Sequence, residues 1–189
     1  AKRRTGPHQR QEKALTHQQN RKSCQPARET VTGAGLSQDE VLVLQVLRLF
    51  CMTYANPGSH AWEEAFSMSV RELGPQHGLR TAQEVMNCIR ALRCTRKTSF
   101  DFIDPTCPCC RKMLAHHESH FMRLLKAERA NDGLTRQMSA VVLCEGENPS
   151  IFLESVTQLA KQLDILTDSK SKTNKPVKRS LKFTGSGTA

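Results

Sequence analysis

The sequence lacks any uninterrupted run of 18 apolar residues, which excludes a bilayer-spanning helix within these 189 residues. No apolar stretch follows the basic N-terminal residues, so we expect no secretory signal there. The chain also lacks a glycine-rich phosphate loop, a nucleophile elbow and a His-Glu-x-x-His metalloprotease motif. We therefore predict a protein that has no membrane partner and is not an enzyme.

Eight cysteines are present, and in a secreted chain they could form four disulfide bonds. Two of them, Cys107 and Cys110, instead have a C-x-x-C spacing that suits a metal site in a reducing compartment. Together with the missing signal, this spacing predicts a cytoplasmic or nuclear protein whose cysteines are reduced.

The net charge of +10 is concentrated at the two ends of the chain. Residues 1–35 carry eight Lys or Arg side chains against two acidic ones, and residues 168–189 carry six against one. The segment between them, 36–167, has 14 basic and 15 acidic side chains. Because both end segments lack an apolar period, we expect two disordered basic tails around one folded domain.

Apolar residues recur at helical spacing between residues 36 and 167, and this pattern predicts a compact all-α bundle of about six short helices. The first helix is apolar nearly all round, which is typical of a helix at the centre of its domain. The predicted helices span about residues 38–54, 60–73, 82–97, 111–130, 135–145 and 149–163.

Local signals place several of the helix ends. The stretches SQDE at Ser37 and TAQE at Thr81 are capping boxes that predict the beginning of the first and third helices. Gly74, followed by a proline, is expected to end the second helix. In the fifth helix we expect four apolar residues to face the core: Met138, Val141, Val142 and Leu143.

The stretch DPTCPCCRKMLAHHESH, residues 104–120, contains three cysteines and three histidines. Cys107 and Cys110 can bind one zinc ion because the turn between them brings their side chains together. If the chain is helical here, His117 lies about 10 Å from Cys110, so ligands from the preceding helix are an alternative. The candidate metal ligands are, in order, Cys107 and Cys110, then Cys94 and His117, then His120, Cys109 and Cys88.

Structural zinc is the cofactor that this stretch favours, followed by an iron–sulfur cluster or haem, which thiolates also hold. The stretch could also bind no metal. Cysteines inside apolar helices are most often small core residues, which is the alternative for Cys51, Cys88 and Cys144. We expect His116 to be solvated, and Glu118, the one candidate base, to lie on a helix surface.

The basic tails predict binding to nucleic acid, DNA or RNA, because flexible cationic segments gain affinity for phosphates by releasing counterions. The third predicted helix adds basic residues near its end, three of them on one stripe that could contact a phosphate backbone. The alternative is a solvated helix face. The predicted nucleic-acid contacts are Lys2, Arg3, Arg4, Arg90, Arg93, Arg96, Lys97, Lys178 and Arg179.

Two functions follow from these features. The first is a zinc-binding helical protein that binds nucleic acid in gene regulation or in packaging of a genome or RNA. The second is a protein-interaction or sensing module whose cysteine cluster responds to redox state or metal level and whose tails contact an acidic protein partner.

Overall fold

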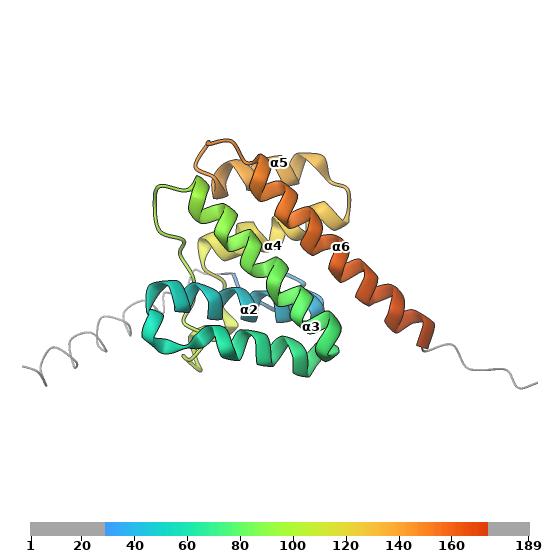
Figure 1. The fold of residues 1–189 in the computed structure, drawn as a ribbon. Helices are drawn as coiled ribbons and strands as arrows, with labels where there is room; N and C mark the ends of the chain where they lie inside the picture. Colours follow the sequence, from blue (N-terminus) through green and yellow to red (C-terminus); the bar gives the residue numbers. More distant parts are fainter. Residues whose placement is uncertain (1–28, 174–189) are drawn as a thin grey trace, which may run out of the picture.

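The computed structural model describes residues 29–173, with side chains through residue 168, and this part of the chain contains five α-helices and no β-strand (Figure 1). The predicted all-α class is confirmed. No helix in the described range is both long enough and apolar enough to cross a membrane. The helices are α2 (Gln38–Ala55), α3 (Ala61–Thr95), α4 (His116–Arg129), α5 (Gly133–Leu143) and α6 (Ser150–Thr173), with 3-10 turns η1 (Pro57–Ser59) and η2 (Cys110–Lys112).

The described residues reach into both predicted tails. Residues 31–35 form turns, and the partly buried Val31 and Ala34 pack against the core. At the other end, α6 continues to Thr173, ten residues beyond the predicted end. The remaining tail residues, 1–28 and 174–189, lie outside the described part of the chain.

Helix α2 begins with the predicted capping box. The backbone N–H of Glu40 donates to Ser37 Oγ (3.3 Å), and the N–H of Ser37 donates to Glu40 Oε2 (2.8 Å). These bonds satisfy donors that a helix start leaves without partners. Every residue of α2 from Val46 to Cys51 is buried, and the helix packs against both α3 and α4. The prediction of a central first helix is therefore confirmed.

Helix α3 joins the second and third predicted helices across a sharp bend at Gly74, which has φ 78° and ψ 165° (Figure 1). The helix resumes directly after the bend, so the prediction that Thr81 caps a new helix is wrong. Thr81 lies buried within α3, and its Oγ1 has no hydrogen-bond partner among the described residues. The two halves of α3 pack so closely that a Cβ added at Gly78 would lie 2.3 Å from the carbonyl oxygen of Ser69.

Helix α5 faces the core with a different side from the one predicted. Met138, Val141 and Val142 are 63, 45 and 39 % exposed, and only Leu143 of the four predicted core residues is buried. The inward face also contains Arg136, whose side chain forms an ion pair with Glu128 of α4. Helix α5 packs closely on α4 because two of its buried residues, Ser139 and Ala140, are small. The apolar pattern alone did not indicate this contact.

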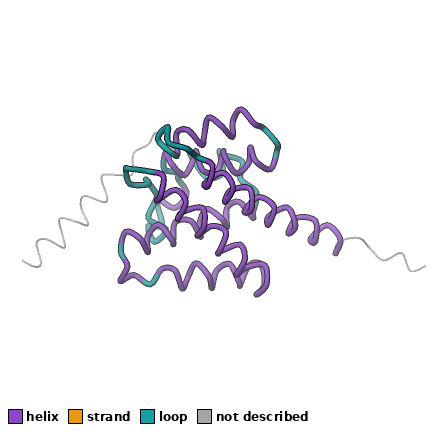
Figure 2. The backbone as a smooth tube through the Cα atoms, turned by 45° about the horizontal axis from the view of Figure 1, so that its top comes forward, coloured by secondary structure: helices purple, strands orange, loops and turns teal. Residues whose placement is uncertain are grey.

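The connection from α3 to α4, residues 96–115, contains no α-helix (Figure 2), and its last residues bond to the N-terminal segment. Val31 N–H donates to Lys112 O (2.9 Å), and Leu114 N–H donates to Glu29 O (2.8 Å). Met113 between these bonds is extended, at φ −100° and ψ 159°. Helix α4 therefore begins at His116, five residues later than predicted, and the C-x-x-C turn is not part of it.

Candidate metal centre and basic surface

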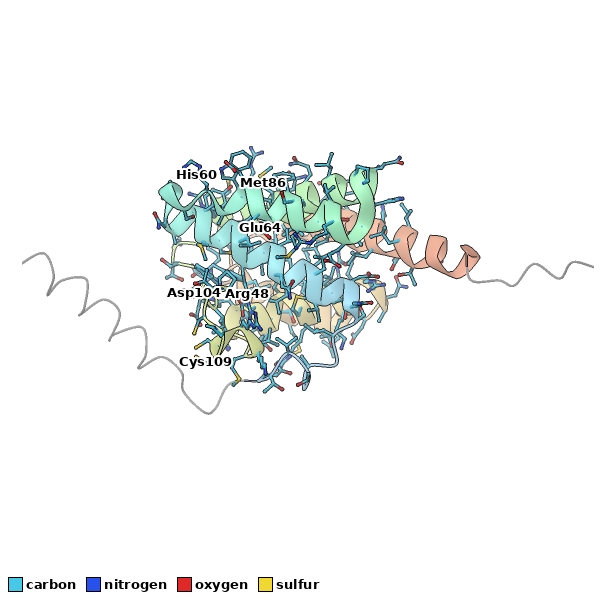
Figure 3. The ribbon with its side chains drawn as sticks, turned by 90° about the horizontal axis from the view of Figure 1, so that it is seen from below. Arg48, His60, Glu64, Met86, Asp104 and Cys109 are labelled. Atoms are coloured by element: carbon cyan, nitrogen blue, oxygen red, sulfur yellow. The ribbon has the colours of Figure 1, made fainter. Side chains whose placement is uncertain are left out.

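Three cysteine side chains converge in the connection between α3 and α4. The Sγ atoms of Cys107 and Cys109 are 3.1 Å apart, and those of Cys109 and Cys110 are 3.5 Å apart. All three sulfurs lie within 4.8 Å of one another, and we call this group the thiol cluster. Cys109 is exposed at the periphery of the molecule, on the side where Arg48 and Asp104 lie (Figure 3).

Local hydrogen bonds form the turn that carries the thiol cluster. The backbone N–H and the hydroxyl of Thr106 both donate to Asp104 Oδ1, at 2.8 and 2.7 Å. Cys107 N–H donates to Asp104 O (3.2 Å), and Arg111 N–H donates to Cys107 O (3.1 Å). The sequence Asp-Pro-Thr-Cys thus folds into consecutive turns in which the short Asp and Thr side chains bond to nearby backbone groups.

A buried ion pair between Arg48 of α2 and Glu118 of α4 lies beneath the turn. Arg48 Nε donates to Glu118 Oε1 (2.7 Å), and Arg48 Nη2 donates to Glu118 Oε2 (2.8 Å). The same guanidinium donates to the backbone carbonyls of Arg111 (2.8 Å) and Met113 (2.5 Å). Arg48 therefore attaches the segment that directly follows the thiol cluster to the central helix.

Glu118 completes this network from the other side. Its Oε1 accepts the backbone N–H of Ile103 (3.0 Å), and its Oε2 accepts that of Ala115 (2.9 Å). Its side chain is fully buried, so the expectation that Glu118 lies on a helix surface is wrong. A buried carboxylate needs this many donors because leaving water is costly for a charge. Sequence reasoning missed Arg48, although a lone charged residue in the middle of an apolar helix is a signal for a buried partner.

The thiol cluster favours ionisation of one of its members. Hydrogen bonds from the Cys109 thiol and then from the Cys110 backbone N–H lower the pKa of Cys107 to about 7. Because the thiolate is the form that binds metal ions, a lowered pKa prepares Cys107 for metal binding at neutral pH. A group of three sulfurs at this spacing could bind a metal ion.

The other predicted ligands lie outside the thiol cluster. His117 Nδ1 accepts the backbone N–H of Asp101 (2.7 Å), and its Nε2 lies 3.3 Å from Arg96 Nη2. Burial and then the neighbouring Arg96 lower the pKa of His117, so its ring stays neutral where it contacts the loop. Cys94 is exposed near the end of α3, and His120 Nδ1 is buried with no hydrogen-bond partner in the described range.

Three further cysteines belong to the core, as the alternative interpretation expected. Cys51, Cys88 and Cys144 are buried within or beside the packed helices. Burial raises the pKa of Cys51 to about 12 and raises those of Cys88 and Cys144 as well. Their thiols stay protonated at neutral pH, and Cys88, the last of the candidate ligands, is a core residue. Cys24 lies outside the described residues.

The three residues of the predicted basic stripe lie on the surface, but the neighbouring predicted contact Arg96 does not. Arg90, Arg93 and Lys97 are exposed, and the Arg93 guanidinium lies 3.9 Å from the centre of the Tyr54 ring. The side chain of Arg96 is only 3 % exposed. It donates to Leu143 O (2.6 Å) and forms an ion pair with Glu145, just after α5. Arg96 thus joins α3 to α5 and does not face solvent. The other predicted nucleic-acid contacts lie outside the described residues: Lys2, Arg3, Arg4, Lys178 and Arg179.

Compared with models of known protein families, with curated proteins and with solved structures, the chain matches none of them. The site itself therefore carries the functional argument. It defines a helical protein with a surface cluster of three cysteines that could bind a metal ion.

Proposed function

We propose that this is a non-enzymatic helical protein that binds one zinc ion at the thiol cluster and binds nucleic acid through basic side chains. The observation that carries the first half is the convergence of three sulfurs within 4.8 Å in one turn. Zinc takes four ligands and prefers thiolates, so Cys107, Cys109 and Cys110 would supply three. The fourth ligand comes from outside the cluster, for which Cys94, His117 and His120 stay predictions.

The metal would stabilise the turn that carries the cluster more than the helical core. The core cluster of buried apolar residues is formed by the helices and does not include the three thiols. Arg48 already holds the backbone at Arg111 and Met113. Zinc bound to Cys107, Cys109 and Cys110 would hold the part of the turn that Arg48 does not contact. Holding a short segment in one conformation is the role of a structural site.

The nucleic-acid half of the proposal is supported by charge. The chain has a net charge of +10, Arg90 and Arg93 are exposed on the second half of α3, and Lys97 is exposed just after it. Lysine and arginine contacts to phosphates position a protein on a duplex or single strand without reading its sequence. The end segments, residues 1–35 and 168–189, supply this net positive charge.

Metal analysis of the full chain, purified under reducing conditions, tests the zinc site. We expect about one zinc per chain, lost in Cys107→Ser and in Cys110→Ser. Cys144→Ser is the matched control, because that buried thiol lies outside the cluster. The helical content in circular dichroism should persist without metal. Zinc-free wild-type protein, or equal loss of zinc in the control, would contradict the site.

Fluorescence anisotropy with a labelled duplex and a labelled single strand tests the nucleic-acid half. Affinity should fall steeply between 50 and 200 mM salt, because each neutralised phosphate releases counterions. Replacing Arg90 and Lys97 by Gln should weaken binding and flatten this salt dependence. Arg71→Gln, exposed on the first half of α3, is the control. Binding that does not depend on salt would contradict the proposal.

A redox- or metal-sensing module is the second candidate, favoured by the 3.1 Å separation of the Cys107 and Cys109 sulfurs. Thiols this close, one with a lowered pKa, form disulfides readily. In this role, oxidation would displace the metal and change binding to an acidic protein partner. The test is whether mild peroxide releases zinc from the protein and whether a thiol reductant then restores zinc binding. Zinc retention under peroxide would exclude it.

A further inference from the structure

A pocket of about 330 Å³ opens between the C-terminal parts of α2 and α3 and the loop that follows α3. One side is formed by α2, with Leu47, Cys51 and Ala55 at helical spacing. The other side is formed by α3, and residues 97–102 pass along the opening. The volume falls within the range of pockets that hold small molecules, about 300–1,000 Å³.

The interior of the pocket is apolar. Leu47, Ile89 and Leu92 are buried and form its floor, and Phe100 and Phe102 contribute half-buried rings from the loop. The thiol of Cys51 also lines the pocket and is uncharged, because burial raises its pKa to about 12. These aliphatic and aromatic walls gain free energy by removing a hydrocarbon from water.

Three cationic side chains line the pocket, and one of them, Arg93, has no acidic partner among the described residues. Arg96 pairs with Glu145 at 3.1 Å, and Lys97 pairs with Glu147 at 2.5 Å. Arg93 makes no ion pair among the described residues and lies against the Tyr54 ring. The position of Arg93 at the mouth leaves its charge available to an anion.

We propose that this pocket binds a fatty carboxylate, with the hydrocarbon tail on the apolar floor and the carboxylate at Arg93. A guanidinium recognises a carboxylate through paired N–H donors, and a fatty chain has no polar group that the floor would leave without a hydrogen bond. A nucleobase fits less well, because its polar edges would face Leu47, Ile89 and Leu92. The inference goes beyond the proposed function and does not depend on the metal site.

Titration calorimetry with dodecanoate, on the full chain and below the micelle concentration, tests the proposal. We expect one saturable site per chain. Arg93→Gln should weaken dodecanoate binding by about tenfold and leave binding of dodecan-1-ol unchanged, since the alcohol has no charge for Arg93 to meet. Arg90→Gln is the matched control, because Arg90 is exposed one turn earlier on α3 and does not line the pocket.

A second variant tests the location independently of Arg93. Ala55 is exposed and lines the pocket, so Ala55→Phe should fill the opening and abolish binding of both dodecanoate and dodecan-1-ol. NMR shift changes on adding dodecanoate should centre on Phe100 and Phe102. Shift changes centred instead on the exposed face of α5, retained binding in Ala55→Phe, or no saturable binding would each overturn the proposal. The results of the metal and nucleic-acid experiments do not bear on this proposal.

Discussion

Arg48 and Glu118, 70 residues apart in the sequence, form a doubly hydrogen-bonded ion pair between α2 and α4 whose side chains are 2 and 0 % exposed. The pair also binds backbone groups of residues 103, 111, 113 and 115. Two helices and the connection that carries the thiol cluster are therefore joined at one point inside the molecule. Removing either charge leaves the other buried without its partner.

Glu118→Gln should lower the free energy of unfolding by about 3–5 kcal/mol, the usual cost of breaking a buried ion pair. Urea denaturation followed by circular dichroism measures this change. The control is Arg71→Met, in an exposed pair with Glu64 at 3.8 Å, for which we expect less than about 1 kcal/mol. If the two variants cost the same, the pair does not anchor the fold.

The orientation of α5 predicts that substitutions at two of its apolar residues lower the free energy of unfolding by different amounts. Leu143→Ala should cost about 2–5 kcal/mol, because Leu143 is fully buried and its loss leaves a cavity. Met138→Ala should cost less than about 1 kcal/mol, since Met138 is 63 % exposed. Thermal and urea unfolding of the two proteins measure both values. The reverse order would mean that α5 packs with its other face.

The close packing of the two halves of α3 makes Gly78 sensitive to substitution. Gly78→Ala should destabilise the protein by about 1–3 kcal/mol, because the new methyl group would overlap the backbone of Ser69. Gly133→Ala is the matched control: no atom lies within 4 Å of its added Cβ, so we expect a change of less than about 1 kcal/mol. Urea midpoints of the two variants decide. A neutral Gly78→Ala would mean that the bend at Gly74 is wider than described.

The lowered pKa of His117 predicts a stability that depends on pH. Because burial and Arg96 hold the folded-state pKa below 6.5, the unfolded chain binds the proton more readily. The contribution of His117 is therefore fully present above pH 6.5 and declines as the pH falls through the lower folded-state pKa. His117→Gln should remove part of this decline.

Urea denaturation at a series of pH values between 5 and 8 measures the effect. His60→Asn is the control, because His60 is exposed and has a left-handed backbone, φ 50°, that asparagine tolerates. The control should leave the pH profile unchanged. A profile for His117→Gln that is parallel to the wild type would contradict the role assigned to His117.

The sequence predicted the helices well where a local signal was decisive. The Ser37 capping box and the continuous apolar run of α2 depend on neighbours in the chain, so both could be recognised without tertiary structure. The beginning of α4 could not, because Met113 is held extended by bonds to the N-terminal segment some 80 residues earlier. Local helical spacing contains no information about such a distant partner.

The candidate site shows the same division. Cys107 and Cys110 follow from their spacing, and the structure places Cys109, a lower-ranked candidate, with them because the turn brings all three sulfurs together. His117 has the residue type of a ligand, yet the loop at Asp101 uses its Nδ1 as a hydrogen-bond acceptor. Which nitrogen is available depends on tertiary contacts that the sequence pattern does not contain.

By itself, the sequence determined the all-α class, the central helix α2 and the cysteines of the turn, because helix periodicity, capping and C-x-x-C spacing are local properties. Only the tertiary structure decided which face of α5 is buried, that Arg96 serves packing and not the surface, and that Arg48 meets Glu118. These outcomes depend on which helices meet, and burial then selects the charges that find partners.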